Sequence, residues 1–171
     1  MFMLAPFMKK NNKNTIELST KPADINQMVQ EIMAIPTKKI KPFIPIVTNG
    51  VVVNVHDGDT ITLATYVNDK LYKFSVRLRG IDCAEIRTTN AIEKECAELA
   101  KKETSELVMG KYVDLENVNI DKYGRLLADV IVNGTNVSHH LLQRRLAVEY
   151  FGKTKIVPKN WMSYYNHGLL I

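Results

Sequence analysis

Cysteine is scarce in this sequence, and its scarcity excludes one class of proteins. The 171 residues contain only two cysteines, Cys83 and Cys96, whereas small secreted domains that depend on disulfides carry several pairs. We therefore expect a fold held together by a hydrophobic core, for which a hydrophobic content of 46% is ample. A single bridge between the two cysteines stays open as an alternative.

The sequence also lacks a long apolar run. No stretch approaches the roughly 20 apolar residues of a membrane-spanning helix. The opening MFMLAPFMKK has its lysines after the apolar residues and a proline among them, which is not typical of a secretory signal. We therefore predict a soluble protein with no membrane partner, located inside the cell in the cytoplasm.

Positive and negative charges nearly balance over most of the chain. Residues 1–48 hold seven lysines and three acidic residues, a net charge of +4, which leaves +1 of the total of +5 for the rest. Any attraction of anions by the folded part must therefore come from the local placement of its charges.

The composition divides the chain into three segments. We predict a mobile basic arm at residues 1–22, a short amphipathic helix with a proline-rich linker at residues 23–48, and a folded domain at residues 49–171. The helix, with Pro22 in its first turn and Pro36 beyond its end, follows from apolar residues at helical spacing: Ile25, Met28, Val29, Ile32 and Met33. Whether it docks on the domain or on a protein partner stays open, and no protein partner is identifiable.

Five segments rich in β-branched and aromatic residues predict strands. They are residues 51–55, 60–67, 71–78, 112–116 and 126–132. In the third segment apolar and polar residues alternate, so we expect Arg77 and Arg79 to share the face opposite the core. The expected core face is formed by Tyr72, Phe74, Val76 and Leu78.

Three further segments predict helices. The first has Asn90 and Glu93 in a capping-box pattern, Cys96 on its apolar stripe as a core residue, and Gly110 as its stop. The others lie near residues 137–146, with His139 and His140 on the solvated side, and near residues 160–166. This order is typical of a mainly β fold with helices (α+β), a five-stranded Greek-key barrel of the oligonucleotide-binding (OB) type with two to three packed helices.

Polar residues that this fold does not require gather in four short segments. Asp59 and Asp82 supply the oxygen ligands that hard divalent cations such as calcium prefer. Glu85 could orient or deprotonate a water molecule, and the guanidinium groups of Arg77 and Arg125 match phosphate oxygens. Together these residue types meet the requirements of phosphodiester hydrolysis.

The motifs DGDT, RLRGIDCAE and DKYGR and the helix ending in RRLAVEY resemble the staphylococcal nuclease (thermonuclease) family, over about Val51 to Tyr150. The resemblance implies a calcium ion bound by Asp59 and Asp82. It also implies three catalytic residues, which are Arg77, Glu85 and Arg125. The substrate-binding residues that it implies are Lys122 and Tyr123 for a terminal phosphate and Tyr150, or alternatively Phe151, for the nucleotide.

One departure from the family lies between the two carboxylates of the second motif. The family has Thr-Pro where this chain has Cys83-Ala84. Loss of the proline frees the backbone before Glu85, so we expect a less preorganised loop. The carbonyl of Cys83 would complete the metal site, and an exposed Cys83 thiol would let soft metals inhibit.

The resemblance implies a calcium-dependent nuclease of low sequence specificity that leaves 3′-phosphate ends. Its substrate would be single-stranded or frayed DNA or RNA, because stacking on Tyr150 needs an accessible base. An inactive OB-fold module that binds nucleic acid or a protein partner is the alternative. A purely structural network of surface ion pairs is a third reading, but exposed pairs contribute little and do not require this arrangement.

Overall fold

The computed structural model describes residues 24–152 and 156–170, so the predicted arm at residues 1–22 lies outside the described residues. The chain forms two compact units, Met1–Lys41 and Pro42–Ile171. In the part that the structure describes, no helix has the length and hydrophobicity needed to cross a membrane.

The first unit contains helix α1 (Ile25–Met33), followed by a single 3-10 turn at Thr37–Lys39. The side chain of Asp24 caps α1 by accepting a hydrogen bond from the backbone N–H of Asn26 at 2.8 Å. Asp24 is thus the N-cap, while Pro22 lies outside the described residues. Pro36 follows the end of the helix as predicted, and no residue of α1 is buried.

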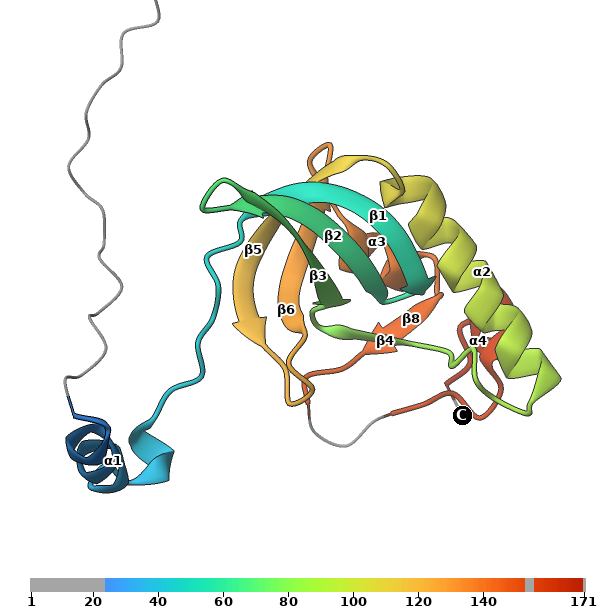
Figure 1. Cartoon of the computed structure of the whole chain (residues 1–171). Helices are drawn as coiled ribbons and strands as arrows, with labels where there is room; N and C mark the ends of the chain where they lie inside the picture. Colours follow the sequence, from blue (N-terminus) through green and yellow to red (C-terminus); the bar gives the residue numbers. More distant parts are fainter. Residues whose placement is uncertain (1–23, 153–155, 171) are drawn as a thin grey trace, which may run out of the picture. The chain divides into compact units, whose positions relative to one another are not determined.

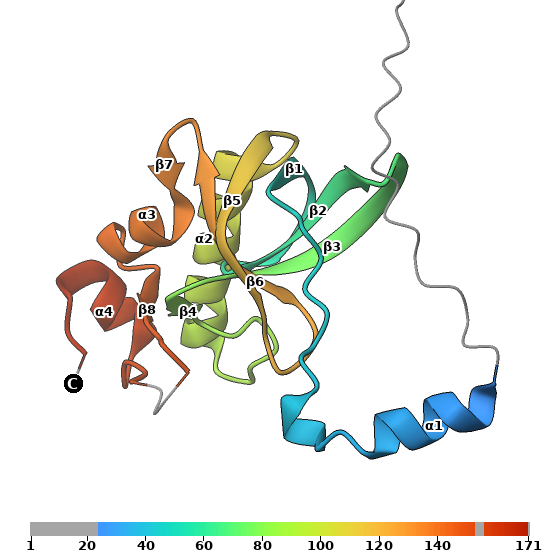
Figure 2. The ribbon, with the colours of Figure 1, turned by 90° about the vertical axis from the view of Figure 1, so that its left-hand side faces the viewer.

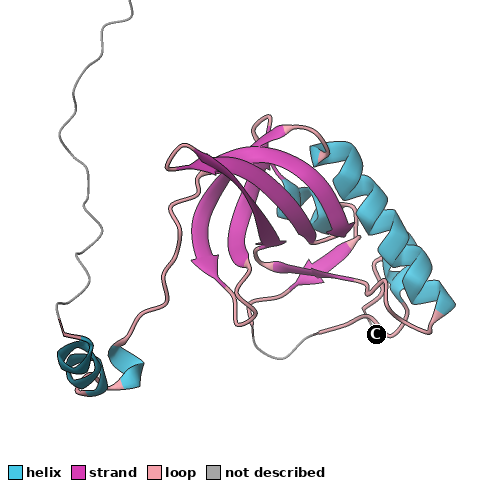
Figure 3. Cartoon of the chain, viewed as in Figure 1, coloured by secondary structure: helices cyan, strands magenta, loops and turns pink. Residues whose placement is uncertain are grey.

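The second unit is a closed barrel, which confirms the predicted fold class (Figures 1 and 3). Neighbouring strands pair antiparallel, and a parallel pairing between β3 and β6 closes the barrel. The five strands are β1 (Asn49–Asp57), β2 (Thr60–Val67), β3 (Lys70–Leu78), β5 (Tyr112–Ile120) and β6 (Leu126–Val132).

All five predicted strands are present, but β1 is two residues longer at each end than predicted, and β5 and the core face of β3 also differ. Strand β5 runs four residues beyond the predicted end at Glu116, through an irregular step at Asn117 with a positive φ of 51°. Tyr72 was expected in the core but is 48% exposed. It lies in the part of β3 near the β2–β3 turn, opposite Thr65, where none of the flanking β3 residues is buried.

Three helices pack on the barrel: α2 (Ala91–Val108), α3 (Val137–Gln143) and α4 (Trp161–His167). Helix α2 runs along β1 and contacts α4 near its own N-terminal end (Figure 2). Cys96 is buried on its inner face as predicted, and both cysteines are free thiols, so the alternative of a disulfide is wrong.

The predicted capping box at the start of α2 is only half formed. The Asn90 side chain accepts hydrogen bonds from the N–H groups of Ile92 and Glu93, at 3.0 and 3.2 Å. The Glu93 carboxylate does not return to the N–H of Asn90, which donates to Thr88 Oγ1 instead. It accepts hydrogen bonds from Thr88 and from the backbone of Glu85.

Three short strands were not predicted from the sequence: β4 (Ile81–Cys83), β7 (Thr135–Asn136) and β8 (Ala147–Glu149). Strands β4 and β8 pair antiparallel, with Asp82 opposite Val148. Beyond this pair, the N–H of Tyr150 donates to the carbonyl of Gly80 at 2.9 Å. Because β4 and β8 lie side by side at one end of the barrel (Figure 1), Asp82 and Tyr150 come to the same end.

Candidate active site

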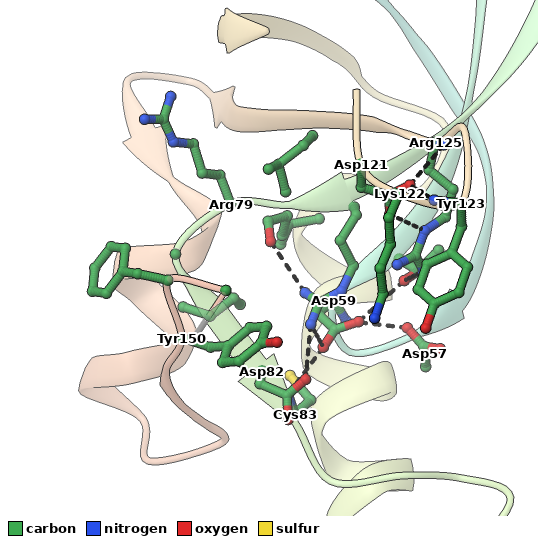
Figure 4. Close-up of a pocket in the computed structure, with 18 of the residues that line it drawn as sticks. Asp57, Asp59, Arg79, Asp82, Cys83, Asp121, Lys122, Tyr123, Arg125 and Tyr150 are labelled. Atoms are coloured by element: carbon green, nitrogen blue, oxygen red, sulfur yellow. Dashed lines mark hydrogen bonds and ion pairs between the residues drawn. The ribbon is translucent and has the colours of Figure 1, made fainter. Parts of the chain in front are cut away.

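A pocket of about 750 Å³ opens at the end of the barrel where β4 and the β5–β6 turn meet. Its walls include all eight residues that the sequence singles out: Asp59, Arg77, Asp82, Glu85, Lys122, Tyr123, Arg125 and Tyr150. Segments separated by up to about 90 residues in sequence therefore meet at one site (Figure 4).

The centre of the pocket is a buried cluster of one arginine and two carboxylates. Nη2 of Arg77 lies 2.9 Å from Oδ2 of Asp59 and 2.9 Å from Oδ1 of Asp82. All three side chains are about one tenth exposed. A single guanidinium nitrogen thus bridges the two residues predicted as metal ligands.

The backbone fixes this cluster from three sides. Asp59 lies in the turn between β1 and β2, where the N–H of Leu78 donates to its carbonyl at 2.8 Å. The N–H of Cys83 on β4 donates to its carboxylate Oδ2 at 2.9 Å. Arg77 pairs with Thr60 across β2 and β3, and its Nη1 donates to the carbonyl of Leu78 at 3.1 Å. Arg77 and Arg79 both line the pocket, but Arg77 is buried, whereas Arg79 is exposed and points away from Asp59 and Asp82 (Figure 4).

Burial controls the protonation of Asp59. Desolvation raises the pKa of this carboxyl from 3.8 to about 7, although the charge of Arg77 and the N–H of Cys83 lower it. The neighbouring carboxylate of Asp57 also raises the pKa, and the value of about 7 is the net result of all these effects. Burial thus disfavours the ionised form of Asp59. Strongly shifted pKa values of this kind cluster at functional sites.

The β5–β6 turn supplies a second arginine in a fixed orientation. Asp121 Oδ2 accepts from Nε of Arg125 at 2.7 Å, and its Oδ1 accepts from the N–H groups of Tyr123 and Arg125 at 2.8 and 3.0 Å. These hydrogen bonds overcome the effect of burial and lower the pKa of Asp121. Two cations lie near the Tyr123 ring: Nζ of Lys122 is 4.9 Å from its centroid, and Cζ of the Arg125 guanidinium is 5.5 Å from it.

Comparison with known proteins agrees with this geometry. The profile described as "Staphylococcal nuclease homologue" matches residues 75–165, which run from the second half of β3 into α4 and include most of the pocket. The chain belongs to this family. It is therefore a hydrolase of the nuclease class, as its sequence motifs predict.

Three individual relatives were found. The chain is 31% identical to Endonuclease YncB of Bacillus subtilis (strain 168), over 87% of this chain and 70% of the relative. It is 36% identical to SPbeta prophage-derived endonuclease YokF of the same organism, over 60% of this chain and 36% of that protein. It is also 36% identical to an uncharacterized 38.1 kDa protein of Capnoides sempervirens, over 46% of this chain and 21% of the relative.

Cys83, where this chain departs from the family pattern, lines the pocket but is buried. Its exposure is 3%, and its Sγ would lie 2.8 Å from a Cβ added to Gly58. Desolvation, with the charge of Asp59, raises the pKa of this thiol. The condition for inhibition by soft metals, an exposed thiol, is therefore not met, and Cys83 packs in the core while its backbone N–H holds Asp59.

The remaining pocket residues lie at its rim. Glu85 is exposed directly after the buried Ala84. Tyr150 lies on the far side of the two carboxylates from Tyr123 (Figure 4). Phe151 also lines the pocket and is 75% exposed. The two aromatic candidates for nucleotide contact are thus both at the site.

Two residues that shape the site were not among the predicted site residues. Asp57 lines the pocket, and its Oδ1 accepts from the N–H of Asp59 at 3.3 Å. Asp121 orients Arg125. Both lie inside the quoted motifs DGDT and DKYGR, so a signal was present, but their contacts depend on turn geometry that spacing alone does not specify.

The donors at the centre suit a hard divalent cation. Among the described residues, no group of three or more His, Cys, Asp or Glu side chains is arranged around one metal position. Asp59 and Asp82 nevertheless present carboxylate oxygens to one shared cationic atom, the Nη2 of Arg77. A divalent cation prefers such oxygen ligands. If it bound both carboxylates, it would replace contacts that Arg77 makes with Asp59 and Asp82.

Proposed function

We propose that this member of the nuclease family is a calcium-dependent enzyme that hydrolyses phosphodiester bonds of DNA or RNA with low sequence specificity. The observation that carries the proposal is that two carboxylates, two arginines and an exposed glutamate line one pocket. Nucleic acid is the class of substrate that the family indicates. A single-stranded or frayed strand would expose the base that stacks on Tyr150 or Phe151.

Each residue in the proposal has one task. Asp59 and Asp82 would hold calcium, which when bound supplies positive charge to a phosphoryl oxygen. Glu85 accepts a proton from the attacking water as its oxygen bonds to phosphorus. The bond from phosphorus to the 5′ oxygen breaks, the departing oxygen takes up a proton from solvent, and the products are a 3′-phosphate and a 5′-hydroxyl.

The two arginines would stabilise the charge that develops on the phosphoryl oxygens. Arg125 suits this task because Asp121 binds its Nε and leaves the Nη groups directed elsewhere, one of them 3.4 Å from Thr60 Oγ1. Arg77 must exchange at least part of its contacts with Asp59 and Asp82 for contacts with phosphate. Lys122 and Tyr123 would contact a terminal phosphate at the rim.

The test is cleavage of labelled single-stranded DNA and RNA in calcium, in magnesium and in EDTA. We expect cleavage in calcium, none in EDTA, and product ends that a polymerase extends only after phosphatase treatment. Glu85→Gln and Arg125→Ala should each lower turnover by at least about 100-fold, the scale of general-base and electrostatic groups.

Glu98→Gln is the matched control, because Glu98 is an exposed carboxylate on α2 that does not line the pocket. Its turnover should equal that of the wild type. Unchanged turnover in both Glu85→Gln and Arg125→Ala would overturn the mechanism. Binding of nucleic acid without cleavage would instead favour the inactive OB-fold module.

A further inference from the structure

The segment between β4 and α2 carries Glu85 without the proline that the family pattern places before it. Ala84 occupies that position and is buried, while Glu85 is exposed. Alanine leaves φ unrestricted, whereas proline fixes it. A general base needs a defined position relative to the water that it deprotonates, so another contact must restrict this segment if Glu85 has that role.

Glu93, in the first turn of α2, makes such a contact. Its Oε1 accepts a hydrogen bond from the backbone N–H of Glu85 at 3.5 Å, and its Oε2 accepts one from Thr88 Oγ1 at 3.0 Å. Thr88 Oγ1 in turn accepts from the N–H of Asn90 at 3.2 Å. One carboxylate therefore ties the start and the end of the four-residue segment Glu85–Thr88 to the helix.

Glu93 is itself held in place. The Asn90 side chain accepts from the N–H of Glu93 at 3.2 Å, so the residue belongs to a capped turn. The negative charge of its carboxylate is favourable near a helix N-terminus. Behind this turn, α2 is anchored in the core by Cys96, Ala97 and Ala100, each at most 3% exposed.

We infer that Glu93 is a positioning residue, which fixes the backbone of Glu85 and so replaces the restriction that a proline would give. The inference rests on the proposed function, in which Glu85 accepts a proton from water. Glu93 does not line the pocket, so it acts through the backbone of Glu85 and not on the substrate. It should therefore affect kcat much more than KM.

The test compares four variants of the full chain. Glu93→Ala removes both contacts and should lower kcat for single-stranded DNA about tenfold, with KM changed less than about twofold, since small misplacements of a reacting group are costly. Glu93→Gln should retain most of kcat, because its amide oxygen still accepts from Glu85 and its amide nitrogen donates to Thr88 Oγ1. Glu95→Ala removes an exposed carboxylate two residues further along α2, which lies about half a turn around the helix. It controls for loss of charge, and Glu85→Gln tests the base.

A second readout does not depend on catalysis. Amide hydrogen exchange of Glu85, measured by NMR without metal or substrate, should be faster in Glu93→Ala than in the wild type and in Glu95→Ala. If Glu93→Ala does not fold, Thr88→Val, which removes one of the two contacts, should still accelerate exchange at Glu85 and lower kcat by about twofold to threefold.

The outcomes separate the two hypotheses. If Glu85→Gln is inactive but Glu93→Ala keeps both normal kcat and slow exchange at Glu85, the inference is wrong and the proposed function stands. An equal loss of kcat in Glu93→Gln and Glu93→Ala would also overturn it, since charge and not hydrogen bonding would then be the cause. If Glu85→Gln is fully active, the proposed function itself fails.

Discussion

Arg77 and Asp59 form a buried ion pair in which Nη2 lies 2.9 Å from the same carboxylate oxygen that accepts the N–H of Cys83. The same nitrogen contacts Asp82. The site therefore contains an internal cation, held by the two residues proposed to bind metal. In the proposed mechanism Arg77 must also contact the phosphate of the substrate. We therefore expect metal binding to Asp59 and Asp82 to be linked to the release of Arg77 from these two carboxylates.

The first prediction is that Arg77→Met binds calcium more tightly than the wild type, by about tenfold. Removing a positive charge next to two carboxylates removes both a repulsion and a competing hydrogen-bond donor, and shifts of this kind amount to one or more powers of ten. Isothermal titration calorimetry with calcium measures the affinity directly, independently of catalysis.

Arg79→Met is the matched control for this variant. Arg79 is two residues from Arg77 and exposed, and its Nη1 donates a hydrogen bond to the carbonyl of Asn117. Its replacement should therefore leave the calcium affinity unchanged within about twofold. Arg77→Met should also melt at a lower temperature in EDTA, because it leaves two buried carboxylates without their cation, and calcium should restore much of this loss. Equal or weaker calcium binding by Arg77→Met would contradict competition.

The second prediction concerns pH and Asp59 without metal. Because the folded-state pKa is raised from 3.8 to about 7, the folded protein binds more protons than the unfolded chain between these values. The contribution of Asp59 to stability therefore falls as pH rises through this window. Asp59→Asn cannot titrate, so its melting temperature relative to wild type should increase from pH 4 to pH 7 in EDTA, by about 10 °C, as expected for a change of about 3 kcal/mol.

A matched variant keeps this test specific. Asp69→Asn lies in the exposed β2–β3 turn, and its melting temperature relative to wild type should not follow pH in the same way. A parallel pH profile for wild type and Asp59→Asn would mean that Asp59 stays ionised in the folded protein.

Local signals were sufficient to predict much of this fold from the sequence. Strand β6 alternates buried and partly buried residues along its length, and the Asn90 cap and Gly110 mark the ends of α2. Strands β4 and β8 escaped prediction because three residues are too few to show a period. Their pairing depends on contacts between segments more than 60 residues apart in sequence.

The candidate site divides in the same way. Residue types and motifs identified eight of the residues that line the pocket. The motifs did not predict the contacts between these residues. Arg77 bridges both carboxylates, and Glu93 contacts Glu85, only because the fold brings β3, β4 and α2 together. The capping-box pattern was misleading for this reason, because a nearby loop competes for the Glu93 carboxylate.

The third prediction is that Asp121→Asn is destabilised at neutral pH and that this loss disappears in acid. The hydrogen bonds from Arg125 lower the pKa of Asp121 below 3.8. Its contribution to stability is therefore present above that value and is lost as pH falls through the folded-state pKa. At pH 7 we expect a loss of about 1 kcal/mol, as for one partly exposed charge-assisted hydrogen bond, measured by urea unfolding.

Activity gives a second measure of the same contact. Asp121→Asn should lower turnover by about tenfold, because Arg125 loses the partner that orients its guanidinium. Asp114→Asn, an exposed carboxylate on the same strand pair, should change neither quantity. A destabilisation of Asp121→Asn that is equal at pH 7 and pH 3 would show that its charge is not the cause.

The fourth prediction concerns the close packing of Gly58 beneath the site. A Cβ at this position would lie 2.7 Å from Cβ of Ala100 and 2.8 Å from Sγ of Cys83. The carbonyl of Gly58 also accepts from Thr104 Oγ1 at 2.7 Å, so the turn cannot move away freely. Gly58→Ala should therefore destabilise the protein by about 1–3 kcal/mol, the usual cost of overpacking.

A double-mutant cycle tests this explanation, because the main clash is with one methyl group on α2. Ala100→Gly removes that methyl and alone should cost about 1 kcal/mol as a glycine within a helix. If the clash is the cause, the two changes together should cost less than their sum, with a coupling of at least about 0.5 kcal/mol. Additive losses in urea unfolding would show instead that Gly58 is required for its backbone conformation and not for the space beside Ala100.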